Sequence, residues 1–205
     1  MTIIQGITEA GMARLKETYF YVFMGVFVAM LGAAVAFPLA SSITGGVFWG
    51  LVIAEFIVLF IFMKERNVFT YLMFTALTGI TLVPVLALYV SIGASGAIVN
   101  ALLGTTMITG GLTWYAATTR KNFLGLGTIL FWILVALLVI MITNLFIGSS
   151  ILALVISSIA IILFSFFIIY DTQSVITGLV EPIDAAMNIY LDVLNLFVHL
   201  LQIFG

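Results

Sequence analysis

The residues best placed to do chemistry lie in the last apolar stretch of the chain. Six polar side chains recur there every three or four residues, namely Asp184, Asn188, Asp192, Asn195, His199 and Gln202. On a helix this spacing gathers them into one stripe, while the other faces stay apolar. In lipid such a stripe must face other helices or water, where its members line a pathway or brace the helices. For the amides, interhelical bracing is the favoured role.

Asp192 is the member of the stripe that is hardest to explain by packing alone. It lies eight residues into the segment, or ~12 Å along a helix axis. A carboxylate at that depth in a membrane is costly, so a functional role is its default interpretation.

Asp171 closes the preceding apolar stretch, and the short return at 172–183 makes the two stretches neighbours. Two carboxyls close together in a low dielectric titrate as a coupled pair. We therefore predict that Asp171 and Asp192 form a pH-sensing gate, in which a proton on one member decides whether the last two segments hold together.

Glu55 is a third acid inside an apolar stretch. Lys64 and Arg66 are nine and eleven residues away, too far along the same helix for direct contact. The carboxyl either finds a partner on another helix, with His199 and Asn100 as candidates, or stays protonated. Pathway lining and packing are equally favoured for it.

A fixed metal site is not expected, because the chain has one histidine and no cysteine. Zinc and copper prefer those ligands. The oxygens of Asp171 and Asp192 suit a transient contact with a hard cation such as Ca²⁺. We predict no cofactor and no catalytic residue.

The composition shows what kind of molecule must position these residues. Of 205 residues, 64% are hydrophobic and only 7% are charged, which excludes a soluble globule. A net charge of −2 leaves no basic face for nucleic acid. Seven runs are long enough to cross a bilayer, at 19–37, 43–63, 68–89, 95–119, 123–147, 149–170 and 184–204. We predict an all-α polytopic membrane protein, one integral membrane domain over 1–205, built as a seven-transmembrane-helix bundle with the last helix central.

The basic residues predict an orientation for this bundle. All six fall at the same end, as Arg14, Lys16, Lys64, Arg66, Arg120 and Lys121. The positive-inside rule then places the N-terminus in the cytoplasm, and short loops favour a prokaryotic plasma membrane. Seven full spans place the C-terminus outside, whereas a re-entrant last segment would return it inside.

Small residues predict where helices approach closely. Gly46 and Gly50 have the spacing of a small-residue packing motif, and Gly110 and Gly111 are expected to serve the same end.

Three runs near the C-terminus carry a family resemblance, namely Tyr170-Asp171-Thr172-Gln173, 189–197 and 200–205. They resemble prokaryotic members of the Bax inhibitor-1 (transmembrane Bax inhibitor motif) family. The resemblance implies a seven-helix fold with the last helix central and a pH-sensitive calcium leak, with paired aspartates that match Asp171 and Asp192. In some relatives an intramembrane glutamate and basic residues brace the closed form, and Glu55 and Arg66 are the counterparts. Some relatives have an arginine where this chain has Gln202, so that partner for Glu55 is lacking.

Three functions are compatible with these features. The first is a cation leak across the bilayer, with Ca²⁺ as its ion. The second is an interaction protein that regulates a membrane-bound protease or another membrane protein partner. The third, an intramembrane aspartyl protease, is disfavoured, because no Gly-x-Gly-Asp precedes Asp192 and no Pro-Ala-Leu follows it. It is also disfavoured because Asp171 is expected at a helix end.

Overall fold

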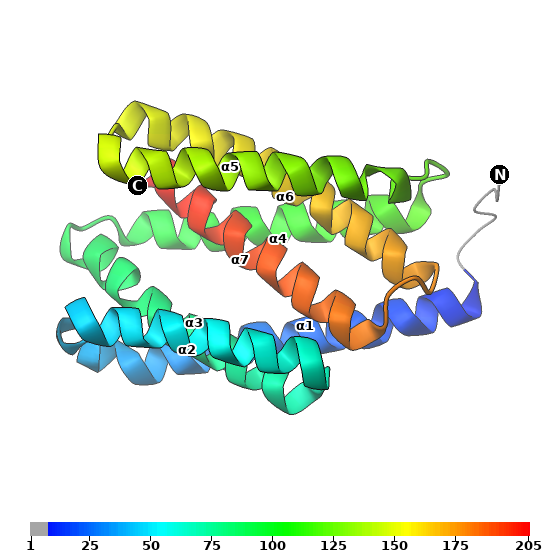
Figure 1. Ribbon diagram of the computed structural model, residues 1–205, viewed down its shortest axis with the longest axis horizontal. Coiled ribbons are helices and arrows are strands. Elements are labelled where there is room, and N and C mark those ends of the chain that lie inside the picture. Colours follow the sequence, from blue (N-terminus) through cyan, green and yellow to red (C-terminus); the bar gives the residue numbers. More distant parts are fainter. Residues whose placement is uncertain (1–7) are drawn as a thin grey trace.

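The protein is a bundle of long helices, described by a computed structural model over residues 8–205 (Figure 1). Seven long helices and two short 3₁₀ turns make up this part of the chain, which contains no strand. Their bounds are α1 (Glu9–Ala36), α2 (Gly45–Glu65), α3 (Val68–Ser91), α4 (Ser95–Thr118), α5 (Gly127–Ile147), α6 (Ser150–Ile176) and α7 (Pro182–Phe204). The 3₁₀ turns are Phe37–Ser42 and Leu124–Leu126. All seven helices are long and apolar enough to span a membrane, so the predicted all-α polytopic fold is confirmed.

The helix ends follow from local sequence chemistry. Thr8, Asn67 and Ser149 precede α1, α3 and α6, and each side-chain oxygen accepts a hydrogen bond from a backbone N–H of the first turn. Pro182 opens α7, at a position where its missing N–H costs nothing. Arg66 ends α2 in the left-handed conformation, with φ of 46°.

The polar end of α6 differs from expectation. The helix runs on past Tyr170 to Ile176, and α7 starts at Pro182, so the connection shrinks to 177–181. The hydroxyls of Ser174 and Thr177 donate to carbonyls one turn back, at 2.8 Å each, and so satisfy themselves without leaving the helix. Asp171 therefore lies inside α6, and its predicted position at a helix end was wrong.

The last helix lies in the middle of the bundle, as predicted. In Figure 1, α7 crosses obliquely between α2 and α3 on one side and α5 and α6 on the other, with α1 and α4 behind it. It packs directly on α1, α4 and α6. Half of the residues in the most apolar stretch of α7 are buried, whereas only 11% are buried in the corresponding stretches of α2 and α5. Those two helices leave most of their surface to lipid.

Glycines allow α1 and α3 to approach closely. A methyl group on Gly79 would collide with the backbone of Ala29, and one on Gly25 would collide with the Tyr71 side chain. The glycines selected from the sequence lie in open space instead. In the described part of the chain, no atom of a neighbouring helix would come within 4 Å of a methyl group added at Gly46, Gly50, Gly110 or Gly111. The prediction that these four lie at close helix contacts was wrong, because spacing alone does not say which face meets a neighbour.

Candidate functional site

A pair of buried acids joins the last two helices. The carboxyls of Asp171 on α6 and Asp192 on α7 lie within hydrogen-bonding reach of each other, and each residue is 5% exposed. Asn188 donates its amide Nδ2–H to Oδ1 of Asp171 at 3.3 Å. Among residues 8–205, no donor reaches Oδ2 of Asp192. Two ionised carboxylates have no hydrogen to share, so the two can bond only through an added proton.

Two further members of the polar stripe, His199 and Gln202, also contact α6. Nδ1 of His199 lies 3.0 Å from the hydroxyl of Ser157, which donates to Oε1 of Gln202 at 2.6 Å. Since that hydroxyl has one hydrogen, the contact with His199 requires the imidazole to donate. The side-chain N–H of Asn195 donates only to the carbonyl of Leu191 in its own helix, at 2.8 Å.

We call this set of contacts the α6–α7 seam, made of Ser157 and Asp171 on α6 with Asn188, Asp192, His199 and Gln202 on α7. Its two anchors on α6 are fourteen residues apart, or ~21 Å along the axis. Between them the helices are closed by apolar packing, with Ala160 and Leu196 fully buried. The seam therefore has polar groups at both ends and an apolar middle.

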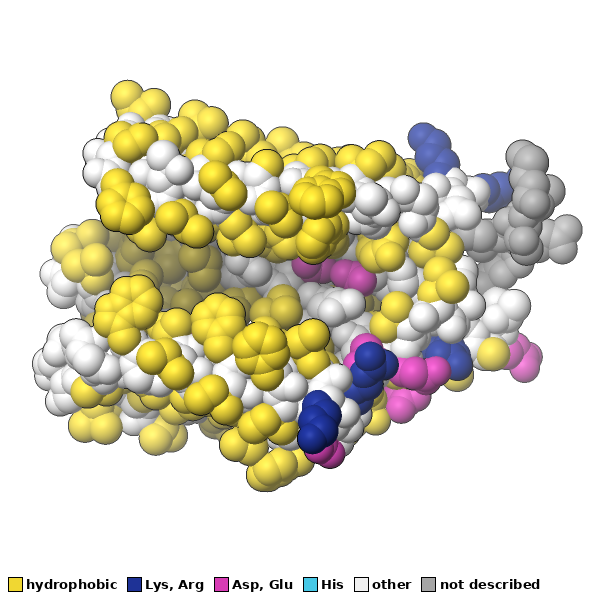
Figure 2. Space-filling model, in the orientation of Figure 1, with side chains coloured by type: hydrophobic (Ala, Val, Ile, Leu, Met, Phe, Trp, Pro, Cys, Tyr) yellow, Lys and Arg dark blue, Asp and Glu magenta, His cyan; other side chains and the backbone are white. Residues whose placement is uncertain are grey.

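A cavity of about 550 Å³ reaches the seam from the end of the bundle that carries the basic residues. We call it the basic-end cavity. Its lining comes from the end of α2, the α6–α7 connection and the start of α7: Leu59, Phe62, Met63, Arg66, Leu179, Val180, Glu181, Asp184, Met187, Asn188 and Leu191. Figure 2 shows a recess on this flank, bordered by apolar side chains, with acidic side chains in its depth and charged ones at one end. Asn188 is exposed on the cavity wall and connects it to Asp171.

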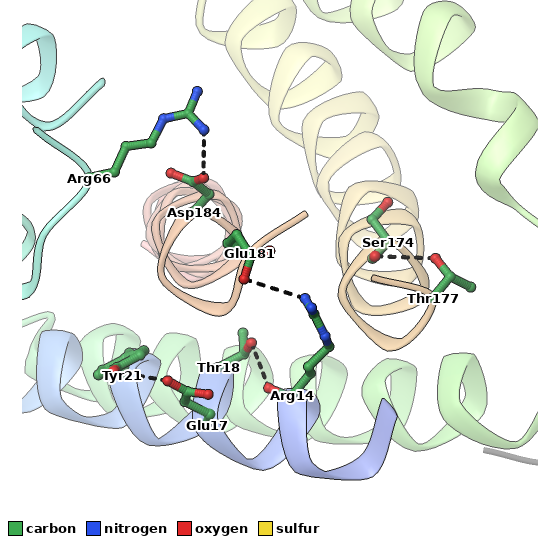
Figure 3. Close-up of polar contacts among 9 residues, drawn as sticks. All are labelled: Arg14, Glu17, Thr18, Tyr21, Arg66, Ser174, Thr177, Glu181 and Asp184. Atoms are coloured by element: carbon green, nitrogen blue, oxygen red, sulfur yellow. Dashed lines mark hydrogen bonds and ion pairs between the residues drawn. The ribbon is translucent and has the colours of Figure 1, made fainter. Parts of the chain in front are cut away.

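Two ion pairs stand at the mouth of this cavity (Figure 3). The guanidinium of Arg66 donates to Asp184 at 3.1 Å, and that of Arg14 donates to Glu181 at 3.5 Å. Arg66 therefore pairs with the start of α7, and its expected lack of direct contact with Glu55 leaves that acid to find a partner elsewhere.

Glu55 has neither of its expected partners. It lies near Thr81 of α3, and within residues 8–205 its Oε1 atom has no hydrogen-bond partner. His199 is engaged by Ser157 instead, and in the same part of the chain Asn100 forms no hydrogen bond with the carboxyl.

Two residues close to the aspartates were missed by the sequence analysis. The hydroxyl of Tyr19 on α1 contacts Thr113 of α4 and lies 3.3 Å from that of Thr172 on α6. Gln173 accepts a hydrogen bond from the N–H of Phe123 at 2.8 Å and donates to the carbonyl of Lys121 at 2.9 Å. Gln173 was visible in the run that begins at Tyr170, but nothing in the sequence indicated what it would hold.

The titratable groups do not assemble into a resident metal site. No group of three or more His, Asp or Glu side chains among residues 8–205 is placed to hold a metal ion. Any contact of the aspartate pair with Ca²⁺ thus involves two carboxyls and the nearby amide of Asn188.

The fold and the site together define a class: a seven-helix membrane protein whose central last helix shares a buried carboxyl pair with the helix before it. The family model described as inhibitor of apoptosis-promoting Bax1 matches residues 11–205. The chain belongs to this family, the Bax inhibitor-1 family, and the resemblance noted in the sequence is confirmed.

Its relatives include bacterial membrane proteins. The chain is 40% identical over 199 residues to an uncharacterized protein of Campylobacter jejuni, covering 92% of this chain and 86% of the relative. It is 33% identical over 198 residues to an uncharacterized membrane protein of Vibrio cholerae, covering 93% and 88%. It is 34% identical over 143 residues to the modulator of FtsH protease YccA of Escherichia coli, covering 69% and 65%. With seven apolar helices, these relatives identify the chain as an integral membrane protein.

Proposed function

We propose that this protein is a pH-sensitive cation leak, with Ca²⁺ among the ions it passes and the Asp171–Asp192 pair as its gate. The observation that carries the proposal is a buried carboxyl pair placed behind a cavity that opens at one end of the bundle. Acids inside membrane helices are expensive and are typical of ion and proton pathways.

The basic-end cavity supplies one half of the pathway. An ion that reaches Asn188 on the cavity wall is one side chain away from Asp171. Carboxylate and amide oxygens are the ligands that Ca²⁺ prefers. Conduction also requires that binding be weak enough for the ion to leave, which suits a site of few ligands.

The other half of the pathway is closed in this structure. Beyond Asp192 the seam is filled by Leu196 and Ala160, both fully buried. The contact that controls this region is the aspartate pair, because its protonation decides whether a shared hydrogen bond or a charge repulsion acts between α6 and α7. The gate in this proposal is therefore the seam itself.

The proposal is tested by reconstituting the protein in liposomes that contain a calcium-sensitive dye. We expect influx above that of empty vesicles, with a rate that changes between pH 6 and pH 8. Asp171→Asn and Asp192→Asn flatten this pH response, since each removes a titrating carboxyl. Asn195→Ala is the matched control, because Asn195 bonds only within its own helix. Influx equal to that of empty vesicles at every pH would refute the leak.

The second candidate is an interaction protein that modulates a membrane-bound protease. The relative from Escherichia coli that is named as a modulator of FtsH protease favours it. The test is a pull-down in mild detergent from the native membrane. A protease retained equally by the native protein and by Asp192→Asn, together with no liposome influx, supports this function over the leak.

We assign no catalytic residue. The longer α6 removes one argument against an aspartyl protease, because Asp171 no longer sits at a helix end. The sequence argument stands, since neither of the motifs that accompany the two aspartates in such proteases is present.

A further inference from the structure

The basic-end cavity carries its charged groups at its mouth, and below them its lining is apolar except for Asn188. Arg66, Glu181 and Asp184 stand at its mouth, where α2 ends and α7 begins. Leu59 and Leu191 line its deep end, each seven residues from a charged residue at the mouth, or ~10 Å along its helix. This gradient matches that of a membrane lipid, with a head group at the interface and a chain below it.

The cavity also opens sideways. Figure 2 looks onto the flank of the bundle, and the recess between its two halves is bordered by apolar side chains that face the viewer. Phe62 and Met63 on α2 and Met187 on α7 belong to the lining of this space. A lipid chain can therefore enter from the bilayer without crossing a polar barrier.

The mouth presents charges of both signs. The Arg66 side chain is 64% exposed and pairs with Asp184, whose side chain is 20% exposed, while Glu181 beside them pairs with Arg14 (Figure 3). An ion pair as open as this contributes little to stability, so its members can exchange partners at small cost.

We propose that this cavity binds a zwitterionic phospholipid with a primary ammonium head group, of the phosphatidylethanolamine type. The lipid phosphate accepts hydrogen bonds from Arg66, the ammonium donates to Asp184 and Glu181, and one acyl chain lies against Phe62 and Met63. The Arg66–Asp184 ion pair is thereby replaced by two ion pairs to the lipid, and no charge at the mouth is left unpaired.

The charge pattern selects this head group over the alternatives. Arg14 and Arg66 already balance Glu181 and Asp184, so an anionic phospholipid would add one unpaired negative charge at the mouth, whereas a zwitterion adds none. A choline head group carries a cation with no N–H, so it cannot donate to either carboxylate. A primary ammonium offers three donors, and charge-assisted hydrogen bonds are the strong ones.

The test is native mass spectrometry of the purified full chain, after equal additions of phosphatidylethanolamine, phosphatidylcholine and phosphatidylglycerol. We expect the native protein to retain phosphatidylethanolamine about tenfold more than the other two, as expected for a hydrogen bond to a charged group. Arg66→Asn and Asp184→Asn reduce that retention by a similar factor. Asparagine is chosen at 66 because it tolerates the positive φ found there.

The matched control is Lys64→Asn, which removes the same charge two residues away from a side chain outside the cavity lining. It should retain the lipid as the native protein does. Equal retention of the three lipids by the native protein, or an equal loss in Lys64→Asn, would overturn the proposal and indicate lipid adsorbed on the surface. Displacement of the lipid by soluble glycerophosphoethanolamine would overturn the proposal too, since the acyl chain would then contribute nothing to binding. A lipid in this cavity covers Asn188, so it has to be displaced before an ion can enter by the path of the proposed leak. Retention is measured without an ion gradient, so the lipid proposal and the leak can fail separately.

Discussion

At the scale of single residues, the α6–α7 seam contains side chains that have a hydrogen-bond partner and one carboxyl oxygen, Oδ2 of Asp192, that lacks one within residues 8–205. His199 through Nδ1 and Gln202 through Oε1 both form a hydrogen bond with Ser157 within the seam. Asp192 has as its neighbour another carboxyl, and within residues 8–205 its Oδ2 atom receives no hydrogen bond. A single proton converts that contact from repulsion into a hydrogen bond. In the proposed leak, this one proton sets the state of the gate.

This arrangement predicts how stability responds to pH. The shared proton is present at low pH and is lost as pH rises, which leaves two negative charges together in a buried site. We therefore expect the Tm of the native protein in detergent to fall between pH 6 and pH 8. Asp192→Asn should reduce this fall, because an amide donates to Asp171 without a shared proton.

Asn195→Ala serves as the control and should keep the native slope of Tm against pH, since Asn195 has no part in the pair. Identical slopes for the native protein and Asp192→Asn would show that the pair does not govern the pH response.

At the scale of elements, the helices are held by two kinds of contact. α1 and α3 meet through glycines, with Gly79 against the backbone of Ala29. α6 holds the α4–α5 connection through the amide of Gln173, which is 2% exposed. Close packing replaces the hydrophobic effect as the force between membrane helices, so both contacts are sensitive to small changes.

Gly79→Ala should separate α1 from α3. The added methyl group meets backbone atoms of Ala29, which cannot rotate away, so we expect a destabilisation of about 1–3 kcal/mol. Gly50→Ala adds the same group where the described chain leaves open space, and it should change stability little. Comparing Tm for the two variants checks the prediction, and equal values would contradict the close contact.

Gln173→Ala should release the connection between α4 and α5. The change leaves the N–H of Phe123 and the carbonyl of Lys121 without their side-chain partner, at a cost of about 0.5–1.5 kcal/mol for each lost hydrogen bond. Trypsin cleavage after Arg120 and Lys121, both exposed, should accelerate in the variant. Gln202→Ala is the control, since it leaves this connection untouched, and equal cleavage rates in the two variants would argue against the anchoring role.

At the scale of the whole molecule, the charges define two unlike ends. All six basic residues lie at the end where α1 begins and where α2 meets α3 and α4 meets α5. The opposite connections, 92–94 between α3 and α4 and Gly148–Ser149 between α5 and α6, carry none. If the basic end is cytoplasmic, as the positive-inside rule predicts, the basic-end cavity opens to the cytoplasm.

The absence of cysteine makes this orientation directly testable. In intact cells, a membrane-impermeant maleimide should label Ser91→Cys, in the exposed end of α3 away from the basic residues. It should label Asn122→Cys, in the exposed α4–α5 connection, only after the membrane is opened. The reverse pattern would place the basic end outside.

The sequence by itself determined the class of the molecule and the candidates for its site. Seven apolar runs and scarce charge leave only a helical membrane bundle, because lipid tolerates no unsatisfied backbone. Polar residues spaced three or four apart lie on one face of any helix, so the stripe that contains Asp192 could be recognised from the sequence alone. The pairing of Asp192 with Asp171 was also predicted, since a short connection makes the two helices neighbours.

Only the tertiary structure decided which partners these residues take. Hydrogen bonds and ion pairs between helices depend on rotation and depth, which local sequence does not specify. That is why Arg66 pairs with Asp184, why His199 meets Ser157 instead of Glu55, and why Gly79 and not Gly50 lies at a helix contact. The basic-end cavity has the same origin, because its walls come from α2, α7 and the connection before α7, and these segments meet only in the folded bundle.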